Sequence, residues 1–277
     1  MNPSDAPIGV FDSGVGGLTV LKALASQMPN EQFIYLGDTA RLPYGTKSRE
    51  TVARYSIQAA EALSEYGVKC LVVACNTASA VGLPGIREHI ESVPVVGVVE
   101  PGAEAACAAS RTGHIAVIAT EATVRGGAYQ EAILRRRADA VVTAQATQLF
   151  VALAEEGLFD GPIVEGVARY YLGPLFSASS APDTLVLGCT HFPMLADTIR
   201  AVLGPGVRIV DSAATTAHAV RATLEAARLM RKETSSAQKS NLPVRFLATD
   251  SIDRFVRVGS RFLARPIAPH EVELIDL

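Results

Sequence analysis

The sequence predicts an α/β protein of two similar domains, each a mostly parallel sheet flanked by helices, with the active site in the cleft between them. Short apolar runs alternate with helix-length segments along the 277 residues. The run that ends in Cys75 is echoed by the one that ends in Cys189, since each has an apolar stretch, a small residue, a cysteine and polar residues. A chain of this length is also long for one hydrophobic core and sufficient for two.

The chain opens with a strand at residues 8–11, a glycine-rich turn at 12–17 and a helix to about residue 28. Such a turn presents backbone N–H groups to an anion at the helix N-terminus. The dinucleotide fingerprint is not met, because Thr19 stands where its third glycine belongs, and no Gly-Lys-Ser/Thr follows as in a P-loop. The turn therefore favours a small carboxylate over a nucleotide, although Asp12 within it is also a candidate helix cap.

The remaining elements follow the same alternation of strand and helix. Further strands are predicted at 33–37, before Cys75, and at 95–98, 115–119, 140–143, 185–187, 207–210 and 244–247. Helices are predicted over an apolar stripe at 52–66, from about 77, from about 100, after 119 to about 137, and at 150–156, 164–176, 215–231 and 252–262. Gly157 is expected just past a helix C-terminus, and Arg228, Arg231 and Lys232 at the end of the long helix are expected to suit its dipole.

The domain division is inferred from the repeated motif. We place one boundary near Val99 and expect the chain to return to the first domain after about Val210. The first domain is then residues 1–98 plus 210–277, and the second is residues 99–209. The polar stretch at 234–241 is expected to be a linker.

Composition excludes several classes of protein. A net charge of −3, with Arg135 to Arg137 as the one basic cluster, argues against a nucleic-acid binder, and that cluster is interpreted as a solvated helix end. No apolar stretch of about 18 residues predicts a membrane span, and the N-terminus lacks a signal pattern. Four cysteines without such a signal are expected to be reduced thiols. We therefore expect a cytoplasmic protein without membrane or nucleic-acid partners.

Two of the four cysteines stand where function is expected. Cys75 and Cys189 lie at the carboxyl ends of strands, where open α/β sheets bind ligands. Cys70 and Cys107 are interpreted as small core residues. No cysteine pair has metal-ligand or redox spacing, so no metal site is expected.

Two chemical roles remain for these thiols. Cys189 with His191 as its base is one arrangement, as in a hydrolase or acyl transferase. A pair of thiols on opposite faces of a carbon acid is the other, with one taking a proton as the other gives one. We favour proton transfer because it uses both cysteines, whereas the hydrolase leaves Cys75 idle.

Proton removal from a carbon acid usually calls for an electron sink. A pyridoxal enzyme needs a Schiff-base lysine, and the chain has only five lysines, none in a pocket-like context. Lys47 is the nearest to the cleft. A route without a cofactor must hold the substrate dry and place fixed hydrogen-bond donors on its carboxylate.

The motifs around these residues closely resemble glutamate racemase, of the aspartate/glutamate racemase family, in family order over nearly the whole chain. They are residues 9–20 (GVFDSGVGGLTV), 36–45 (LGDTARLPYG), 74–79 (ACNTAS), 100–102 (EPG) and 188–193 (GCTHFP). The resemblance implies cofactor-independent interconversion of L- and D-glutamate, which supplies D-glutamate for peptidoglycan. It also implies two α/β domains with the active site between them, usually as a homodimer.

The resemblance also assigns roles to residues. Cys75 and Cys189 match the two acid/base thiols, Asp12 the carboxylate that assists the first, and His191 the imidazole that assists the second. Glu155 matches a further acidic residue, with Glu156 as the adjacent alternative. The substrate-contacting positions are matched by Asp12, Ser13, Tyr44, Gly45, Asn76, Thr77, Thr123, Thr190 and His191.

The sequence departs from the family pattern in two places. Ala146-Thr147 stands where the family often has Cys-Pro, and Arg125-Gly126 follows Thr123-Val124 where a serine is common. Both departures lie in the second domain and leave its loop contacts open. Aspartate as substrate, a Cys-His hydrolase, and a partner-binding protein that has lost turnover remain the alternatives.

Overall fold

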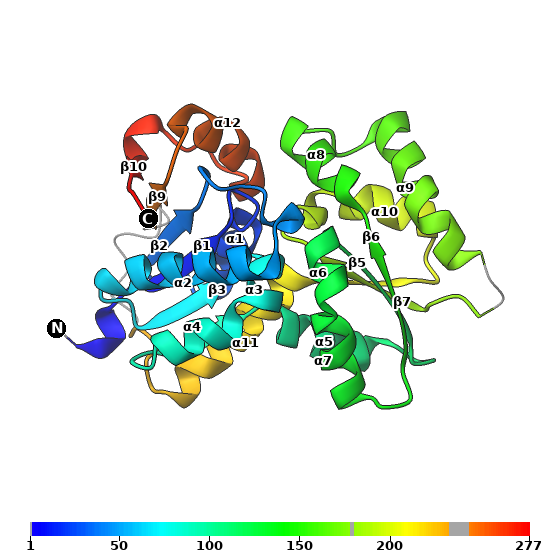
Figure 1. Cartoon of the computed structure of the whole chain (residues 1–277), viewed down its shortest axis with the longest axis horizontal. Helices are drawn as coiled ribbons and strands as arrows, with labels where there is room; N and C mark the ends of the chain where they lie inside the picture. The colour runs from blue at the N-terminus through cyan, green and yellow to red at the C-terminus, as the bar shows by residue number, and fades with distance from the viewer. Residues whose placement is uncertain (1, 178–179, 233–243) are drawn as a thin grey trace.

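Two parallel sheets form the framework of the computed structural model, which describes residues 2–177, 180–232 and 244–277 (Figure 1). The larger sheet has six strands in the order β10-β9-β2-β1-β3-β4, and the smaller has four in the order β6-β5-β7-β8. Every described strand pair is parallel. This arrangement confirms the predicted α/β class.

The larger sheet combines both ends of the chain. Its strands are β1 (Ile8–Asp12), β2 (Phe33–Gly37), β3 (Cys70–Val73), β4 (Val95–Gly97), β9 (Val244–Ala248) and β10 (Val272–Leu274). One face is covered by α1 (Leu18–Gln27), α11 (Ser212–Ala226) and α12 (Ile252–Leu263). The other is covered by α2 (Arg49–Glu65), α3 (Asn76–Val81) and α4 (Leu83–His89).

Alternate residues of each strand pack into the hydrophobic cores on the two faces of this sheet. Ile8 and Val10 of β1 pack toward α1 and α12, whereas Phe11 packs toward α2. A strand covered on both faces is apolar along its whole length, which is why β1 and β2 appear in the sequence as continuous apolar runs. Three short 3-10 helices accompany this half, η1 (Pro3–Asp5), η2 (Tyr44–Thr46) and η4 (Pro269–Glu271).

The smaller sheet is built entirely from the middle of the chain. Its strands are β5 (His114–Ala119), β6 (Val141–Ala146), β7 (Thr184–Gly188) and β8 (Arg208–Asp211). One face is covered by α8 (Gln148–Glu156), α9 (Gly161–Phe176) and α10 (Ala196–Leu203). The other is covered by α5 (Val99–Ala109) and α7 (Ala128–Arg136), while α6 (Glu121–Gly126) and η3 (Phe192–Leu195) follow the tips of β5 and β7.

The two sheets repeat one topology. In both, the second strand lies beside the first, and the third and fourth follow on the other side: β2-β1-β3-β4 and β6-β5-β7-β8. The connections reverse direction between the first and third strands, the position where parallel sheets bind ligands. Cys75 follows β3 and Cys189 follows β7, so the echo in the sequence reflects equivalent positions in two similar halves.

Three local predictions need correction. The helix expected from 119 to about 137 is broken at Gly127, whose φ of 69° ends α6 and begins α7. The long helix ends at Ala226 rather than at residue 231, because Arg228 takes a φ of 56°. Arg231 therefore does not serve the helix dipole, and its backbone N–H donates to Glu31.

The remaining predictions concern the basic cluster, the polar linker and the membrane. Arg135 and Arg136 are exposed in the last turn of α7, as predicted, and both also pair with Glu100 at 2.5 Å. The predicted linker at 234–241 lies outside the described residues. Within the described part of the chain, no helix is both long enough and apolar enough to cross a membrane.

Candidate active site

One cavity lies between the strand tips of the two sheets and opens to solvent. Both predicted thiols line it. Its walls also include Ser13, Tyr44, Gly45, Asn76, Thr77, Glu155, Thr190 and His191, all predicted from sequence. Asp12 and Thr123 do not line the cavity; both are buried behind its wall.

The Cys75 side of the cavity is built from neutral hydrogen-bonding groups. Cys75 is the N-cap of α3, and its sulfur accepts from the backbone N–H of Ala78 at 3.4 Å. Its thiol also lies 3.4 Å from the hydroxyl of Ser13. Burial, reinforced by the negative charge of Asp12, raises the pKa of Cys75 to about 12. The thiol form is therefore the resting form at neutral pH.

Asp12 lies at the tip of β1 beneath this thiol. One of its oxygens, Oδ2, accepts from the backbone N–H of Gly14 at 2.9 Å, so the carboxylate occupies part of the loop expected to bind an anion. Asp12 is not a helix cap, because the N-cap of α1 is Gly17. Burial raises the pKa of Asp12, against the opposing charge of His191.

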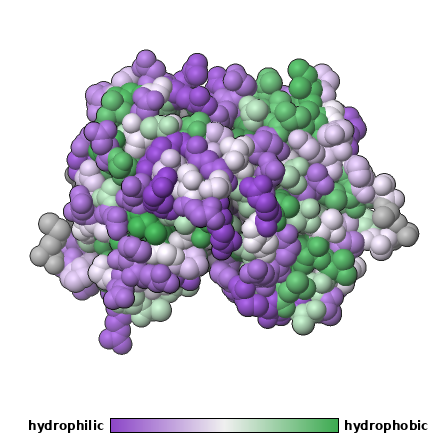
Figure 2. Space-filling view, viewed as in Figure 1, coloured by the Kyte–Doolittle hydropathy of each residue, from purple (hydrophilic) through white to green (hydrophobic). Residues whose placement is uncertain are grey.

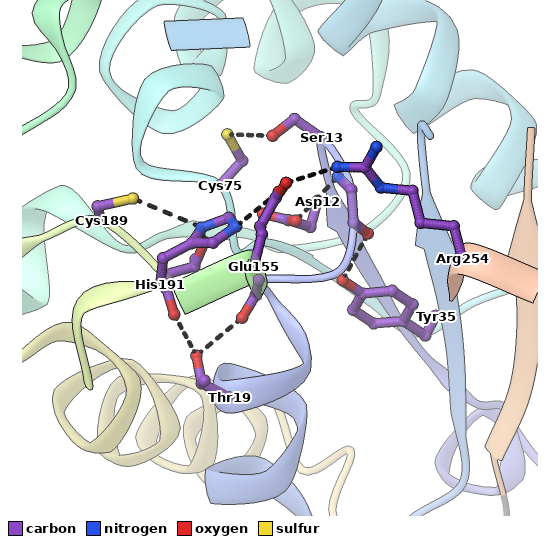
Figure 3. A network of polar contacts seen from close by, with 12 residues as sticks. Asp12, Ser13, Thr19, Tyr35, Cys75, Glu155, Cys189, His191 and Arg254 are labelled. Carbon is purple, nitrogen blue, oxygen red and sulfur yellow. Dashed lines mark hydrogen bonds and ion pairs between the residues drawn. The ribbon is translucent and has the colours of Figure 1, made fainter. Parts of the chain in front are cut away.

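The Cys189 side of the cavity is built from charged groups (Figure 3). The sulfur of Cys189 lies 3.7 Å from Nδ1 of His191. The other ring nitrogen, Nε2, lies 3.1 Å from Oε1 of Glu155. The second oxygen of Glu155 accepts from Arg254 at 2.6 Å, so four side chains form one chain of contacts from sulfur to guanidinium.

This chain of contacts changes the acid–base properties of its members. Burial alone would lower the pKa of His191, but its contacts with Cys189 and Glu155 outweigh burial and raise it to about 10. Burial would raise the pKa of Glu155, yet His191 and Arg254 bring it below its usual value. At neutral pH the pair is therefore an imidazolium and a carboxylate, and a positive charge lies beside the Cys189 sulfur.

The structure also decides between two neighbouring acids. Glu155 lines the cavity and contacts His191, whereas Glu156 is exposed. Both lie in the last turn of α8, which ends at Gly157 in the left-handed conformation, as the sequence predicts. One residue along a helix is a turn of about 100°, so only one of two adjacent residues can face the cavity.

Hydroxyl groups join the two halves across the cavity. Thr77 of the larger half lies 2.9 Å from Thr120 and 3.2 Å from Thr123 of the smaller half. Thr19 donates to the backbone carbonyl of Thr190 at 3.0 Å. Gly45 is required here, because a Cβ at this position would lie 2.7 Å from Cβ of Thr120. The halves are thus in close contact around the site.

Two aromatic hydroxyls support the walls. Asn76 donates to the hydroxyl of Tyr129 at 2.7 Å, which joins α3 to α7. Tyr44, expected as a substrate contact, both lines the cavity and packs between Phe11 and Tyr55. Its hydroxyl donates to Asp38 at 2.5 Å.

The polar atoms left over define the ligand that the cavity suits. Among the described residues that line the cavity, two amide oxygens are buried without a hydrogen-bond partner: Oδ1 of Asn76 and Oε1 of Gln148. Buried acceptors of this kind call for a ligand with several N–H donors, such as an ammonium group. The hydroxyls of Ser13 and Thr190, which also line the cavity, can donate to carboxylates.

Several cavity residues were missed from sequence. Thr120, Gln148, Val151, Leu42, Pro43 and Gly14 line the cavity as well. Thr120 follows the tip of β5 as Ser13 follows the tip of β1, so the repeated topology could have identified it. Gln148 directly follows the departure at Ala146-Thr147. Arg254 carried no signal, because its partner Glu155 is 99 residues away.

Comparison with known proteins shows the family to which the chain belongs. The model of the Asp/Glu/Hydantoin racemase family matches residues 8–220. A glutamate racemase of Geobacter metallireducens is 48% identical over 256 residues, or 92% of each chain. A glutamate racemase of Koribacter versatilis is 45% identical and covers 98% of this chain and 97% of its own.

Solved structures give the same result. The crystal structure of Francisella tularensis glutamate racemase in complex with D-glutamate has a TM-score of 0.89 at 35% identity, covering 99% of this chain and 98% of its own. The Thermus thermophilus enzyme in complex with β-chloro-D-alanine has a TM-score of 0.86 at 45% identity, with the same coverage. The chain therefore belongs to the Asp/Glu/Hydantoin racemase family of isomerases, and the four relatives named above are glutamate racemases.

Proposed function

We propose that this protein interconverts L- and D-glutamate without a cofactor, with Cys75 and Cys189 acting on opposite faces of the α-carbon. The observation that carries the proposal is the pair of buried free thiols, one from each half, on one cavity. Relatives of 42–48% identity that bear the name glutamate racemase support glutamate as the substrate. So does the structural neighbour that holds D-glutamate.

Substrate recognition follows from the unpaired polar atoms. The α-ammonium group would be held by buried acceptors such as Asn76 Oδ1, with the Asp12 carboxylate behind them. The two carboxylates would accept from hydroxyl groups and backbone N–H groups, of which Ser13, Thr77 and Thr190 are candidates. Such fixed donors stabilise the charge that develops on the α-carboxylate when the α-proton leaves.

Proton transfer needs one ionised and one protonated thiol. Cys75 rests as the thiol, since burial and Asp12 raise its pKa. The protonated imidazole of His191 lies 3.7 Å from the Cys189 sulfur, and we assign to Cys189 the role of the base. Cys189 then removes the α-proton from one face while Cys75 gives its proton to the other. The reverse reaction runs from the opposite protonation state, with Asp12 and His191 assisting their own thiols.

The wider role of the protein is part of the same proposal. A D-glutamate product would serve peptidoglycan synthesis, and free thiols agree with a cytoplasmic location.

We propose residues 1–98 plus 210–277 and residues 99–209 as the two domains. We also propose a homodimer, supported by exposed apolar side chains on and beside α8 and α9 (Figure 2). They are Leu149, Leu158, Ile163 and Tyr170.

Hydrogen exchange tests the proposed reaction directly. The purified protein is incubated with L-glutamate in deuterated water without pyridoxal phosphate, and the product is analysed by NMR and chiral chromatography. We expect deuterium at the α-carbon and D-glutamate as product. No exchange from either enantiomer would reject the proposal, and faster exchange with aspartate would reassign the substrate.

A further inference from the structure

We propose that Arg254 of α12 is a positioning residue for proton transfer at Cys189: it fixes the Glu155 carboxylate, which in turn holds His191 beside the sulfur. This inference rests on the proposed function and extends it to a residue outside the cavity wall. Arg254 touches neither thiol, so it would act through Glu155 (Figure 3).

The geometry gives each oxygen of Glu155 one partner. Oε1 lies 3.1 Å from His191, and Oε2 lies 2.6 Å from Arg254. The Glu155 side chain is 20% exposed, so without Arg254 its second oxygen would face water and the carboxylate could rotate away from the ring. A charge-assisted hydrogen bond at this distance is strong and directional.

Two further contacts of α12 reach the same group of residues. The ring of Phe262 packs edge-on against the His191 ring, with centroids 5.2 Å apart. Arg261 donates to the backbone carbonyl of Glu156 at 3.2 Å, near the C-terminal end of α8. One helix thus contacts the imidazole, the carboxylate and the end of the helix that carries the carboxylate.

These contacts cross between the two halves of the molecule. α12 packs on α1 and belongs to the larger half, whereas Glu155 and His191 belong to the smaller half. Through Arg254, the positions of Glu155 and His191 beside the Cys189 sulfur therefore depend on how the two halves pack against each other. The acid–base group is complete only when α12 lies against α8.

The positive charge of Arg254 should affect the pH dependence of the reaction. Glu155 contacts His191, which follows β7, and Arg254 of α12, while Cys189 lies at the other ring nitrogen of His191. The charge of Asp12 also acts on His191, and Arg261 contacts the residue after Glu155. Removing the Arg254 charge removes one of the two groups that keep the pKa of Glu155 low. The acidic limb of the pH–rate profile should therefore move to higher pH.

The test compares Arg254→Met and Arg254→Lys with Arg257→Met, a matched control at an exposed arginine of the same helix. We expect Arg254→Met to lower kcat by roughly tenfold or more, with KM changed less than about twofold. Its acidic limb should move upward in pH. Arg254→Lys should keep the limb near its original position and recover part of kcat, and Arg257→Met should match the unmodified protein.

Iodoacetamide labelling of the substrate-free proteins separates positioning from general damage. Mass spectrometry of the two cysteine peptides should show that Arg254→Met slows alkylation of Cys189 and leaves Cys75 unchanged. Unchanged kcat and pH profile in Arg254→Met, or equal changes at both cysteines with a lowered unfolding temperature, would overturn the inference. Because labelling needs no substrate, it still tests Arg254 if glutamate exchange fails.

Discussion

Cys75 and Cys189 occupy the same place in two copies of one topology, each just beyond the third strand of its half. Their surroundings differ. Cys75 contacts a hydroxyl and a backbone N–H, with the Asp12 carboxylate beneath. Cys189 contacts an imidazole that is joined to a carboxylate and a guanidinium.

The difference shows how one chemical group can be prepared for opposite tasks. Burial and the negative charge of Asp12 hold the first sulfur protonated, whereas a positively charged imidazole lies beside the second. Two residues with opposite environments provide one acid and one base at a single pH. The backbone supplies equivalent positions, and the side chains around them supply the asymmetry.

The largest expected effect is the loss of either thiol. Cys75→Ala and Cys189→Ala should each lower racemisation by about 10²–10⁴-fold or more, because each removes the acid or the base for one face. Chiral chromatography of glutamate measures this loss. Full activity in either variant would end the two-thiol mechanism, and a trapped acyl-enzyme with an indifferent Cys75 would instead indicate a hydrolase.

Substituting the residues that contact the two thiols should lower kcat to different extents. His191→Asn should lower kcat by about 10²-fold, since it removes the charge beside Cys189. Ser13→Ala should cost tenfold or less, because it removes one neutral hydrogen bond from Cys75. Steady-state kinetics in both directions measures both effects, and equal losses would contradict the proposed asymmetry.

The alkylation rates of Cys75 and Cys189 can be compared without any substrate. At pH 7.5 Cys189 should be alkylated at least about tenfold faster than Cys75, because only the thiolate reacts and the pKa of Cys75 is raised to about 12. Peptide mass spectrometry over a time course gives the two rates. The reverse order would mean that Cys75 is the resting base.

The smallest expected effect is on stability. The pKa of His191 is raised from 6.5 to about 10 in the folded protein, so folding favours its protonated form. That stabilisation is fully present below pH 6.5 and is lost as the pH rises through about 10. Urea unfolding at pH 6.5 and 9.5 should show a smaller pH-dependent loss in His191→Asn than in the unmodified protein.

Much of the fold could be predicted because its signals are local. The strands around Ile8, Phe33 and Leu185 are apolar along their length since helices cover both faces, and Gly157 ends α8 as expected. Helix lengths were less predictable. Gly127 and Arg228 end helices through their positive φ. The Gly126-Gly127 pair is a turn signal that the prediction of one continuous helix did not use, whereas no such signal marks Arg228.

The residues of the site can also be divided into those that could be predicted from sequence and those that could not. The sequence alone indicated two equivalent thiols at strand tips, because the pattern around each is local, and its resemblance to glutamate racemase added Asp12, His191 and most of the cavity wall. Only the tertiary structure chose Glu155 over Glu156, added Thr120 and Arg254, and placed Thr123 behind the wall. Those outcomes depend on contacts such as Thr19 with Thr190 and Glu155 with Arg254, whose partners lie 171 and 99 residues apart. Packing of the two halves, rather than any local preference, brings such residues together.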